Sequence, residues 1–516
     1  MLQTTPAVRV IATSREPLRV AGEQIYPVQP LAVPTEDSPG IEDSLRYGAV
    51  LLFVERARAA APHFSSDARI SAAIVGICRR LDGIPLGIEL AAARAAAFGI
   101  EGLAAGLDDR FRLLTGGRRT ALPRHQTLRA TLDWSYELLT ELERVVLRRL
   151  AIFPGGGFSL QAASTVAADD EVAASEVVDY VANLVAKSLV TAEAGGPRVR
   201  YRLLETTRAY SLEKLVEAGE FDAVARRHAR RYLDLFDGAE AEAAIRPIGE
   251  WLAEYVPRMD NLGAALDWAF SADGDATIGV ALTAAAIPLW MLLSLMEECR
   301  RRVERALAAI AAGTGGAARF EMRLRAALGM SLKYTSSDVP NIRATWKKAL
   351  EIAENLGDVE YQLRSLWGLW GDLHISGPQS DTDNVALALA QRFYELAVNR
   401  SDRNDCLIGE RMIATSQYHL GDLDSARRHI ERVVAHKIAP AQKWQFFRFG
   451  VDHWTAAQIA LARILWLQGF PDQAIQKAVS PKIGRTITRS QWVRLWLWRC
   501  ARSRCLGAIW PRRDIM

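Results

Sequence analysis

The sequence has few cysteines, and they are not spaced to bind a metal or to form a disulfide framework. The five cysteines are scattered along 516 residues, and no two of them have the Cys-x-x-Cys spacing. An odd number of isolated cysteines is typical of reduced thiols in a cytosolic protein. The eight histidines are equally dispersed, and neither a Gly-x-Ser-x-Gly nor a His-Glu-x-x-His motif occurs. These absences leave no candidate metal site and no set of catalytic residues.

Targeting and membrane-spanning features are also missing. Residues 1–10 contain neither the basic segment nor the apolar run of a secretory signal peptide. The longest uncharged stretch, 276–296, is about as long as a membrane span, but it is rich in alanine, contains Pro288 and leads into a highly charged segment. A buried helix in a helical stack fits it better, so we expect a cytoplasmic protein without membrane contact.

Neither sign of charge dominates the chain. The 64 lysines and arginines nearly balance the 60 acidic residues, and a net charge of +4 gives no reason to infer a nucleic-acid partner. The end of the chain differs, because residues 473–513 contain no acidic residue but many basic ones and four tryptophans. Such a composition could bind single-stranded nucleic acid or an anionic membrane. The abrupt loss of the preceding helical pattern favours a shifted reading frame instead.

The most informative stretch is 74–94, where two helices are expected to meet at a tight corner. Apolar residues recur at helical spacing up to Leu81, and Asp82 with Gly83 ends the first helix. Pro85 stands where the second helix begins, a position that needs no amide donor. Alone, this pattern indicates only a corner in an all-α core.

Other motifs accompany the corner in a fixed order. They are Val8–Arg15 before it, and Phe111–Gly117, Thr131–Phe158 and Tyr201–Leu215 after it. Together they resemble the signal transduction ATPases with numerous domains (STAND), the NB-ARC-like "predicted ATPase" transcriptional regulators of bacteria with LuxR-type or AfsR-type architecture. The resemblance covers the first half of the chain in motifs and the second half in architecture, where helices similar to tetratricopeptide repeats follow.

The resemblance implies a mainly α fold in which a remnant of an α/β NTPase sheet precedes three helical parts. The expected segments are 1–40, the C-terminal remnant of the NTPase α/β domain; 41–120, a helical lid bundle with the corner; 121–220, a winged-helix switch domain; 221–479, a superhelix of TPR-like repeats; and 480–516, the basic, tryptophan-rich tail. Within the first segment, β-branched and apolar residues predict short strands at 8–13 and 24–28.

The resemblance also assigns nucleotide-binding roles to residues of this chain. Arg15, after the first predicted strand, matches the sensor arginine that reaches the γ-phosphate, and a guanidinium suits that role because it is always charged and bidentate. Gly83 and Pro85 match the corner at which a rigid proline ring packs against adenine. We therefore expect a sensor and an adenine contact in the first two segments.

A fourth candidate, Glu205, lies in the segment that aligns with the family's Met-His-Asp switch. Leu203, Leu204 and Glu205 occupy the three positions. The family's histidine donates to the β-phosphate of ADP, and Leu204 cannot. Either the ADP state is restrained differently here, or the segment is only the start of a helix, which Glu205 favours through the helix dipole.

The chain lacks the phosphate-binding part that this family uses. The motif Gly-x-x-x-x-Gly-Lys-Ser/Thr occurs nowhere, and only seven residues precede the first predicted strand. The chain therefore resembles the C-terminal portion of a longer regulator. ATP or ADP, the cofactor of an intact family member, is expected to bind weakly or not at all, and we expect the chain to be no enzyme.

Winged helices often bind DNA, but the pattern over 122–215 argues against that role. We predict helices at 128–138, 141–151, 159–166 and 177–187, and strands at 189–192 and 200–203. The expected recognition helix, 177–187, contains a single lysine, whereas a DNA reader needs several donors to phosphates and bases. We interpret the domain as an internal switch and expect DNA binding only through a missing N-terminal effector domain.

Paired helices are predicted over the second half of the chain. Gly421 and Ala426 resemble the turn and the small contact residue of a tetratricopeptide repeat, and 469–479 repeats that offset. Helix pairs at 317–355, 359–399, 404–436 and 444–479 follow, with 276–310 as an irregular earlier pair. Stacked pairs form a groove for a small inducer, a peptide or a protein, and self-association is also open. The tryptophans that could line the groove are Trp346, Trp367, Trp370, Trp444, Trp454 and Trp466.

Two functions fit these features. The first is the sensor and switch portion of an ATP-dependent STAND-type transcriptional regulator, in which the repeats bind the signal. The alternative is a stand-alone TPR-type interaction scaffold without nucleotide binding.

Overall fold

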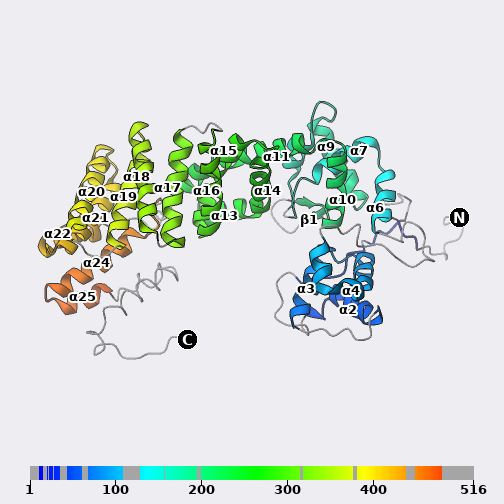
Figure 1. The fold of residues 1–516 in the computed structure, drawn as a ribbon, viewed down its shortest axis with the longest axis horizontal. Helices are drawn as coiled ribbons and strands as arrows, with labels where there is room; N and C mark the ends of the chain where they lie inside the picture. Colours follow the sequence, from blue (N-terminus) through cyan, green and yellow to red (C-terminus); the bar gives the residue numbers. More distant parts are fainter. Residues whose placement is uncertain are drawn as a thin grey trace. The chain divides into compact units, whose positions relative to one another are not determined.

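The computed structural model shows a mainly helical chain that forms two compact units (Figure 1). Unit 1 comprises Met1–Leu235 and Tyr255–Ile278, and unit 2 comprises Phe236–Glu254 and Gly279–Met516. The structure describes residues 11–14, 20, 22–26, 28–34, 44–60, 68–107, 128–155, 157–193, 199–313, 318–336, 338–375, 380–436 and 448–478. None of the helices in these ranges is long and apolar enough to cross a membrane.

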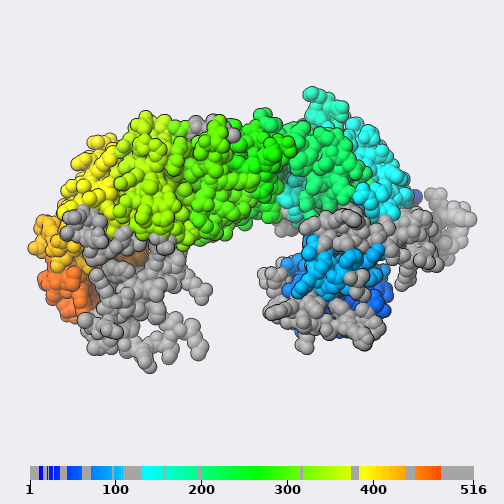
Figure 2. Space-filling view, in the orientation of Figure 1, coloured from blue at the N-terminus to red at the C-terminus, as the bar shows by residue number. Residues whose placement is uncertain are grey.

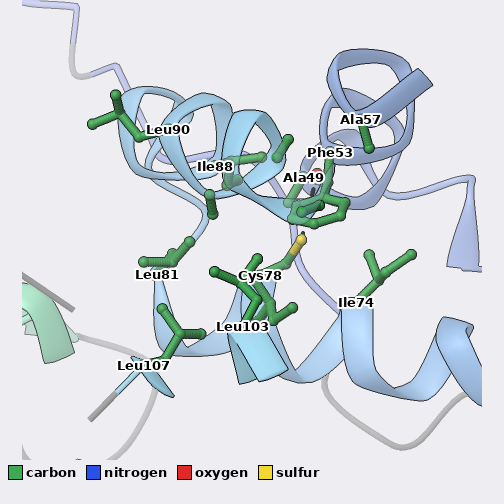
Figure 3. Packing of buried hydrophobic residues seen from close by; sticks show 14 of the residues in the cluster. Ala49, Phe53, Ala57, Ile74, Cys78, Leu81, Ile88, Leu90, Leu103 and Leu107 are labelled. Carbon is green, nitrogen blue, oxygen red and sulfur yellow. Dashed lines mark hydrogen bonds between the residues drawn. The ribbon is translucent and has the colours of Figure 1, made fainter. Parts of the chain in front are cut away.

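A three-helix bundle, here called the lid bundle, lies in unit 1. It consists of α2 (Gly48–Ala60), α3 (Ala68–Arg80) and α4 (Pro85–Gly106). Their apolar faces meet around Phe53, Cys78 and Ile88, all fully buried (Figure 3). The thiol of Cys78 donates to the carbonyl oxygen of Ala49 at 3.5 Å, and burial raises its pKa to about 12. Gly99, with φ +68°, breaks the helical path of α4.

A winged helix follows in the same unit, and its predicted helices and strands are confirmed with boundaries shifted by a few residues. The elements are α6 (Leu128–Glu137), α7 (Glu141–Leu150), α8 (Leu160–Ala167), α9 (Ala174–Ala186), β1 (Thr191–Glu193), β2 (Arg200–Arg202) and α10 (Glu205–Glu217). Thr140 and Glu143 form a capping box that begins α7, and the Ser159 hydroxyl caps α8. The two strands pair antiparallel with Ala192 opposite Tyr201.

The prediction of two strands near the start of the chain is wrong for those of their residues that the structure describes. Residues 11–13, 24–26 and 28 have no regular secondary structure, and Ile11 is 98% exposed. A strand needs a neighbour for its amides and carbonyls, and β1 and β2 form the one sheet of the described chain and pair with each other. The expected remnant of an NTPase sheet is therefore absent there; residues 8–10 lie outside the described ranges.

Three further helices of unit 1 follow the winged helix, and two of them, α11 and α14, are joined to it by a buried polar chain. They are α11 (Phe221–Asp237), the 3-10 helix η3 (Val256–Arg258) and α14 (Met259–Ala269). Nε2 of His228 in α11 lies 3.0 Å from Oδ1 of Asn261 in α14, and the Asn261 amide donates to the carbonyl oxygen of Gly157 at 3.0 Å. Because Asn261 offers its carbonyl oxygen, His228 donates through Nε2. Burial lowers the pKa of His228 to about 4, so the ring is neutral.

Unit 1 should lose stability as the pH falls from about 6.5 to about 4. In this window the unfolded chain binds a proton at His228 and the folded chain does not, so stability falls with falling pH, by about 3 kcal/mol in all. Urea unfolding at a series of pH values measures the slope. His228→Gln should flatten it, whereas His436→Gln, at an exposed histidine, should not. An equal slope in His228→Gln and wild type would contradict this assignment.

Unit 2 is a stack of antiparallel helices, and its four predicted helix pairs are confirmed. The stack contains α12 (Ala239–Ile245), α13 (Ile248–Tyr255), α15 (Ala276–Leu292) and α16 (Met296–Ala311), then the pairs α17 (Ala318–Thr335) with α18 (Val339–Asn355), α19 (Val359–Ile375) with α20 (Ser380–Asn399), α21 (Arg403–Leu420) with α22 (Leu423–Ala435), and α24 (His453–Leu467) with α25 (Pro471–Ala478). From α16 on, successive helices pack on one another, and Figure 2 shows them following in chain order along the surface.

Local features of the repeats agree with the sequence pattern. Gly421, with φ +86°, ends α21 in the left-handed conformation, and Ala426 is fully buried against the neighbouring helices. Three of the six predicted groove tryptophans belong to the core: Trp346, Trp367 and Trp370 are buried. Trp454 is half-buried, Trp466 is 40% exposed, and Trp444 lies outside the described residues.

Candidate functional site

The corner between α3 and α4 is held by two consecutive residues with positive φ. Asp82 has φ +54° and Gly83 has φ +67°. The carbonyl oxygen of Gly83 accepts from the amide of Leu31 at 3.0 Å, and a Cβ at Gly83 would lie 2.1 Å from the carbonyl oxygen of Leu31. A side chain does not fit at this position, and the left-handed backbone also favours glycine. Gly83 therefore fixes the segment that contains Leu31 against the lid bundle.

Asp82 links this corner to α10 across 124 positions of sequence. Its Oδ2 accepts from the amide of Thr206 at 3.0 Å and from the Thr206 hydroxyl at 3.3 Å. Leu204, the residue before α10, provides no side-chain cap, so Asp82 supplies the acceptor that the first turn needs. Burial raises the pKa of Asp82, although the amides of Thr206 and Glu205 oppose the shift.

Helix α10, the last element of the winged helix, packs both on the lid bundle and on α7. Tyr210 belongs to the buried core of the lid bundle, and its hydroxyl donates to Oδ1 of Asp133 at 2.7 Å. Arg208, on the same helix, donates to the carbonyl oxygen of Ala151 at the end of α7. The two helices α10 and α7 pack on each other. Helix α10 therefore connects the corner to the other helices of the winged helix.

The structure brings three of the four predicted site residues to this corner region. Gly83 forms the corner, Pro85 is the first residue of α4 and is exposed, and Glu205 is the first residue of α10. Both oxygens of Glu205 bind Arg208 at 2.9 Å. Arg15 lies outside the described residues. Sequence reasoning missed Asp82, since an Asp-Gly pair after a helix indicates only its end.

The corner residues do not fit a triphosphate. Asp82 and Glu205 bring two carboxylates to the corner region, and the guanidinium of Arg208 is already bound by Glu205. Anionic phosphates need free cationic or amide donors. Over the described ranges, no cluster of His, Cys, Asp and Glu could hold a metal ion either.

The exposed face of α9, the helix in the recognition position, lacks positive charge. Residues 174–186 contain no lysine or arginine, and Glu176 and Asp179 are exposed. Lys187, which follows the helix, donates to both oxygens of Glu143 at 2.8 Å. The Glu143 side chain is only 4% exposed, and although burial raises its pKa, the contacts with Lys187 lower it below its usual value. The single lysine of the predicted recognition helix, Lys187, thus forms an ion pair within the domain.

The fold defines a protein class with a winged helix followed by TPR-like helical repeats, and comparisons identify proteins to which the chain is similar. Residues 139–216 match the winged helix-turn-helix domain family. Over 298 residues the chain is 41% identical to proteins of Mycobacterium tuberculosis and Mycobacterium bovis named "Putative HTH-type transcriptional regulator", covering 58% of this chain and 32% of theirs. Over 231 residues it is 42% identical to an uncharacterized M. tuberculosis protein, and this match covers 45% of this chain and 56% of the relative.

The chain thus spans about a third of the length of the HTH-type regulators and just over half of the length of the uncharacterized protein. Among solved structures, a STAND protein with a tetratricopeptide repeat sensor from Pyrococcus horikoshii aligns over 90% of this chain and 74% of its own. The sequence identity is 13% and the TM-score 0.32, which is too loose to transfer any property.

Alanine substitutions at Gly83 and Gly99 can distinguish two contributions to the loss of stability: the close contact with Leu31 at the corner, and the strain of a positive φ. Both residues have nearly the same positive φ, but a Cβ at Gly99 would meet nothing within 4 Å. Gly99→Ala should cost about 1–3 kcal/mol for backbone strain alone, because Gly99, with φ +68° and ψ 165°, lies in a region that is essentially restricted to glycine. Gly83→Ala should cost about 1–3 kcal/mol more, because the new methyl group meets the Leu31 carbonyl. Urea unfolding of the full chain tests this, and equal losses would show that the Leu31 contact is unimportant.

Proposed function

We propose that this chain is the sensor and switch portion of an ATP-dependent, STAND-type transcriptional regulator. The observation that carries the proposal is the link from the corner to the winged helix: Asp82 caps α10, and α10 packs on both parts. A change at the corner reaches the winged helix through these contacts. The identity to mycobacterial proteins named as HTH-type regulators supports a role in transcription.

In this proposal the helical repeats bind the signal, a small inducer or a protein or peptide, and DNA is bound through an effector domain outside this chain. Nucleotide contact within the chain is limited to a base stacked on Pro85. Because the described corner residues do not fit a triphosphate and the phosphate-binding motif is absent from the sequence, binding is weak and there is no turnover.

Titration of the full chain with a fluorescent ATP analogue tests the nucleotide contact. Weak binding is expected, and Pro85→Ser should weaken it further because the ring that packs on the base is lost. Pro471→Ser is the matched control, since Pro471 is also an exposed first residue of a helix. Phosphate release should equal that of a protein-free blank, with or without Arg15→Ala.

Two results would contradict this part of the proposal. Absence of any binding would favour the stand-alone repeat scaffold. Robust Mg²⁺-dependent turnover that Arg15→Ala reduces would show that other residues supply a complete phosphate site.

The winged helix should not bind DNA. Mixing the chain with random duplex DNA at physiological salt should give no electrophoretic shift, because the exposed face of α9 is acidic. In the wing, Arg202 pairs with Glu193 at 2.5 Å and Arg200 donates to the carbonyl oxygen of Pro257. A shift that disappears on replacing Arg198, Arg200 and Arg202 with alanine would refute the switch assignment.

A further inference from the structure

Residues 448–450, which precede α24, lie across three successive helix pairs of unit 2. The guanidinium of Arg448 binds carboxylates of α19 and α21, and Gly450 lies so close to α17 that a Cβ there would be 3.2 Å from the Tyr334 hydroxyl oxygen. Outside its own pair, helix α24 packs mainly on α22 and α21. The three residues, here called the inserted segment, therefore reach two pairs further back along the stack than the helix that follows them.

The inserted segment places Arg448 between two carboxylates. Its Nε and Nη2 donate to the two oxygens of Glu360 at 2.6 and 2.7 Å, and its Nη1 and Nη2 donate to those of Asp405 at 2.7 and 3.0 Å. Paired bonds of this kind suit the planar guanidinium group better than an ammonium group. The Asp405 side chain is fully buried, and Arg448 is its one ion-pair partner among the described residues. The site therefore requires a cation at this position.

Phe449, the next residue of the segment, lies among three aromatic rings beside this ion pair. Its side chain is fully buried, and its ring centroid lies 5.7 Å from that of Trp367, 6.0 Å from that of Phe393 and 5.3 Å from that of His453. The rings of Phe393 and His453 meet Phe449 edge to face, which is a favourable arrangement for aromatic pairs. The site thus suits a guanidinium group that is followed by an aromatic ring.

The inserted segment does not satisfy every group around it. A cavity of about 30 Å³ remains beside Arg448. Nε1 of Trp367 is buried and has no hydrogen-bond partner. Nδ1 of His453 accepts from Nε of Arg411 at 3.1 Å, so Nε2 carries the hydrogen of the neutral ring, and this buried donor has no partner either. Unpaired buried donors are rare in proteins, so this occupant fits the site incompletely.

We propose that this site binds a peptide segment of another protein in which an arginine is followed by an aromatic residue, and that the inserted segment occupies it as an internal competitor. The partner's arginine takes the place of Arg448, so Asp405 stays paired, and the partner's ring takes the place of Phe449. Because one guanidinium group replaces another, the exchange leaves no buried carboxylate uncompensated, whereas release of the segment alone does. Binding follows from these contacts, and its role as the regulatory signal rests on the proposed function.

Calorimetric titration of the full chain with a synthetic peptide of residues 445–452, acetylated and amidated at its ends, tests this proposal. The wild type should bind the peptide weakly, since the inserted segment competes with it. The variant Arg448→Ser/Phe449→Ser should bind the peptide at least about tenfold more tightly, because the competitor is lost. The same peptide with glutamine in place of its arginine should bind this variant at least about tenfold more weakly than the unchanged peptide.

Three results of these titrations would overturn the proposal. They are absence of peptide binding to the variant, equal affinity of the wild type and the variant for the peptide, and equal affinity of the variant for the two peptides. Binding of N-acetylargininamide as tightly as of the peptide would overturn the peptide assignment, because the aromatic contacts would then contribute nothing. Thermal unfolding gives an independent readout: the peptide should raise the unfolding temperature of the variant more than that of the wild type.

A second variant keeps both side chains and weakens only the fit of the segment. Gly450 and Gly469 have φ +69° and +84°, but a Cβ at Gly469 would meet nothing within 4 Å. Gly450→Ala should increase the affinity for the peptide by about tenfold, because release of the segment relieves the contact with Tyr334. Gly469→Ala, the matched control, should not change it, and equal effects of the two variants would refute the internal competitor. Binding of the peptide without any binding of the ATP analogue would keep this inference and remove the nucleotide part of the proposed function, and the opposite result would do the reverse.

Discussion

The hydrogen bonds between Asp82 and Thr206 hold unit 1 together at its most constrained point. Asp82 and Gly83 both have positive φ, and this backbone directs the Asp82 carboxylate to α10 while Gly83 meets Leu31. One sharp corner therefore fixes an extended segment, two helices of the lid bundle and the first turn of α10. Since α10 also packs on α7, this one helix joins the corner to the rest of the winged helix.

Local pattern was sufficient to predict most helices but not the contacts that join them. Apolar spacing and the glycine at 421 predicted the helix pairs of unit 2, because each amphipathic face must be buried against its neighbour. The role of Asp82 could not be predicted, because its partner Thr206 is 124 residues away. The strand at 8–13 was predicted wrongly for residues 11–13, because a β-branched run forms a strand only beside another strand.

Buried charge, rather than apolar contact alone, sets how the repeats of unit 2 align. Arg448, which precedes α24, binds Glu360 of α19 and Asp405 of α21, and the Asp405 side chain is fully buried. Removing one partner of such a network leaves a buried charge uncompensated, which costs about 3–5 kcal/mol. Leucine contacts tolerate sliding of one helix along another, whereas bidentate ion pairs do not. The network therefore specifies one register for three successive repeats.

The path of the chain limits how this architecture could have been assembled from separate genes. The chain passes between the two units three times, after residues 235, 254 and 278. Helix α12 lies in the short middle segment, and its Glu240 is the carboxylate partner of Arg323 in α17. A recombination event that joined the repeats at a single junction after residue 278 would leave Arg323 without this partner. The segment around α12 thus belongs to the same packed unit as the repeats, although it is separated from them in the sequence.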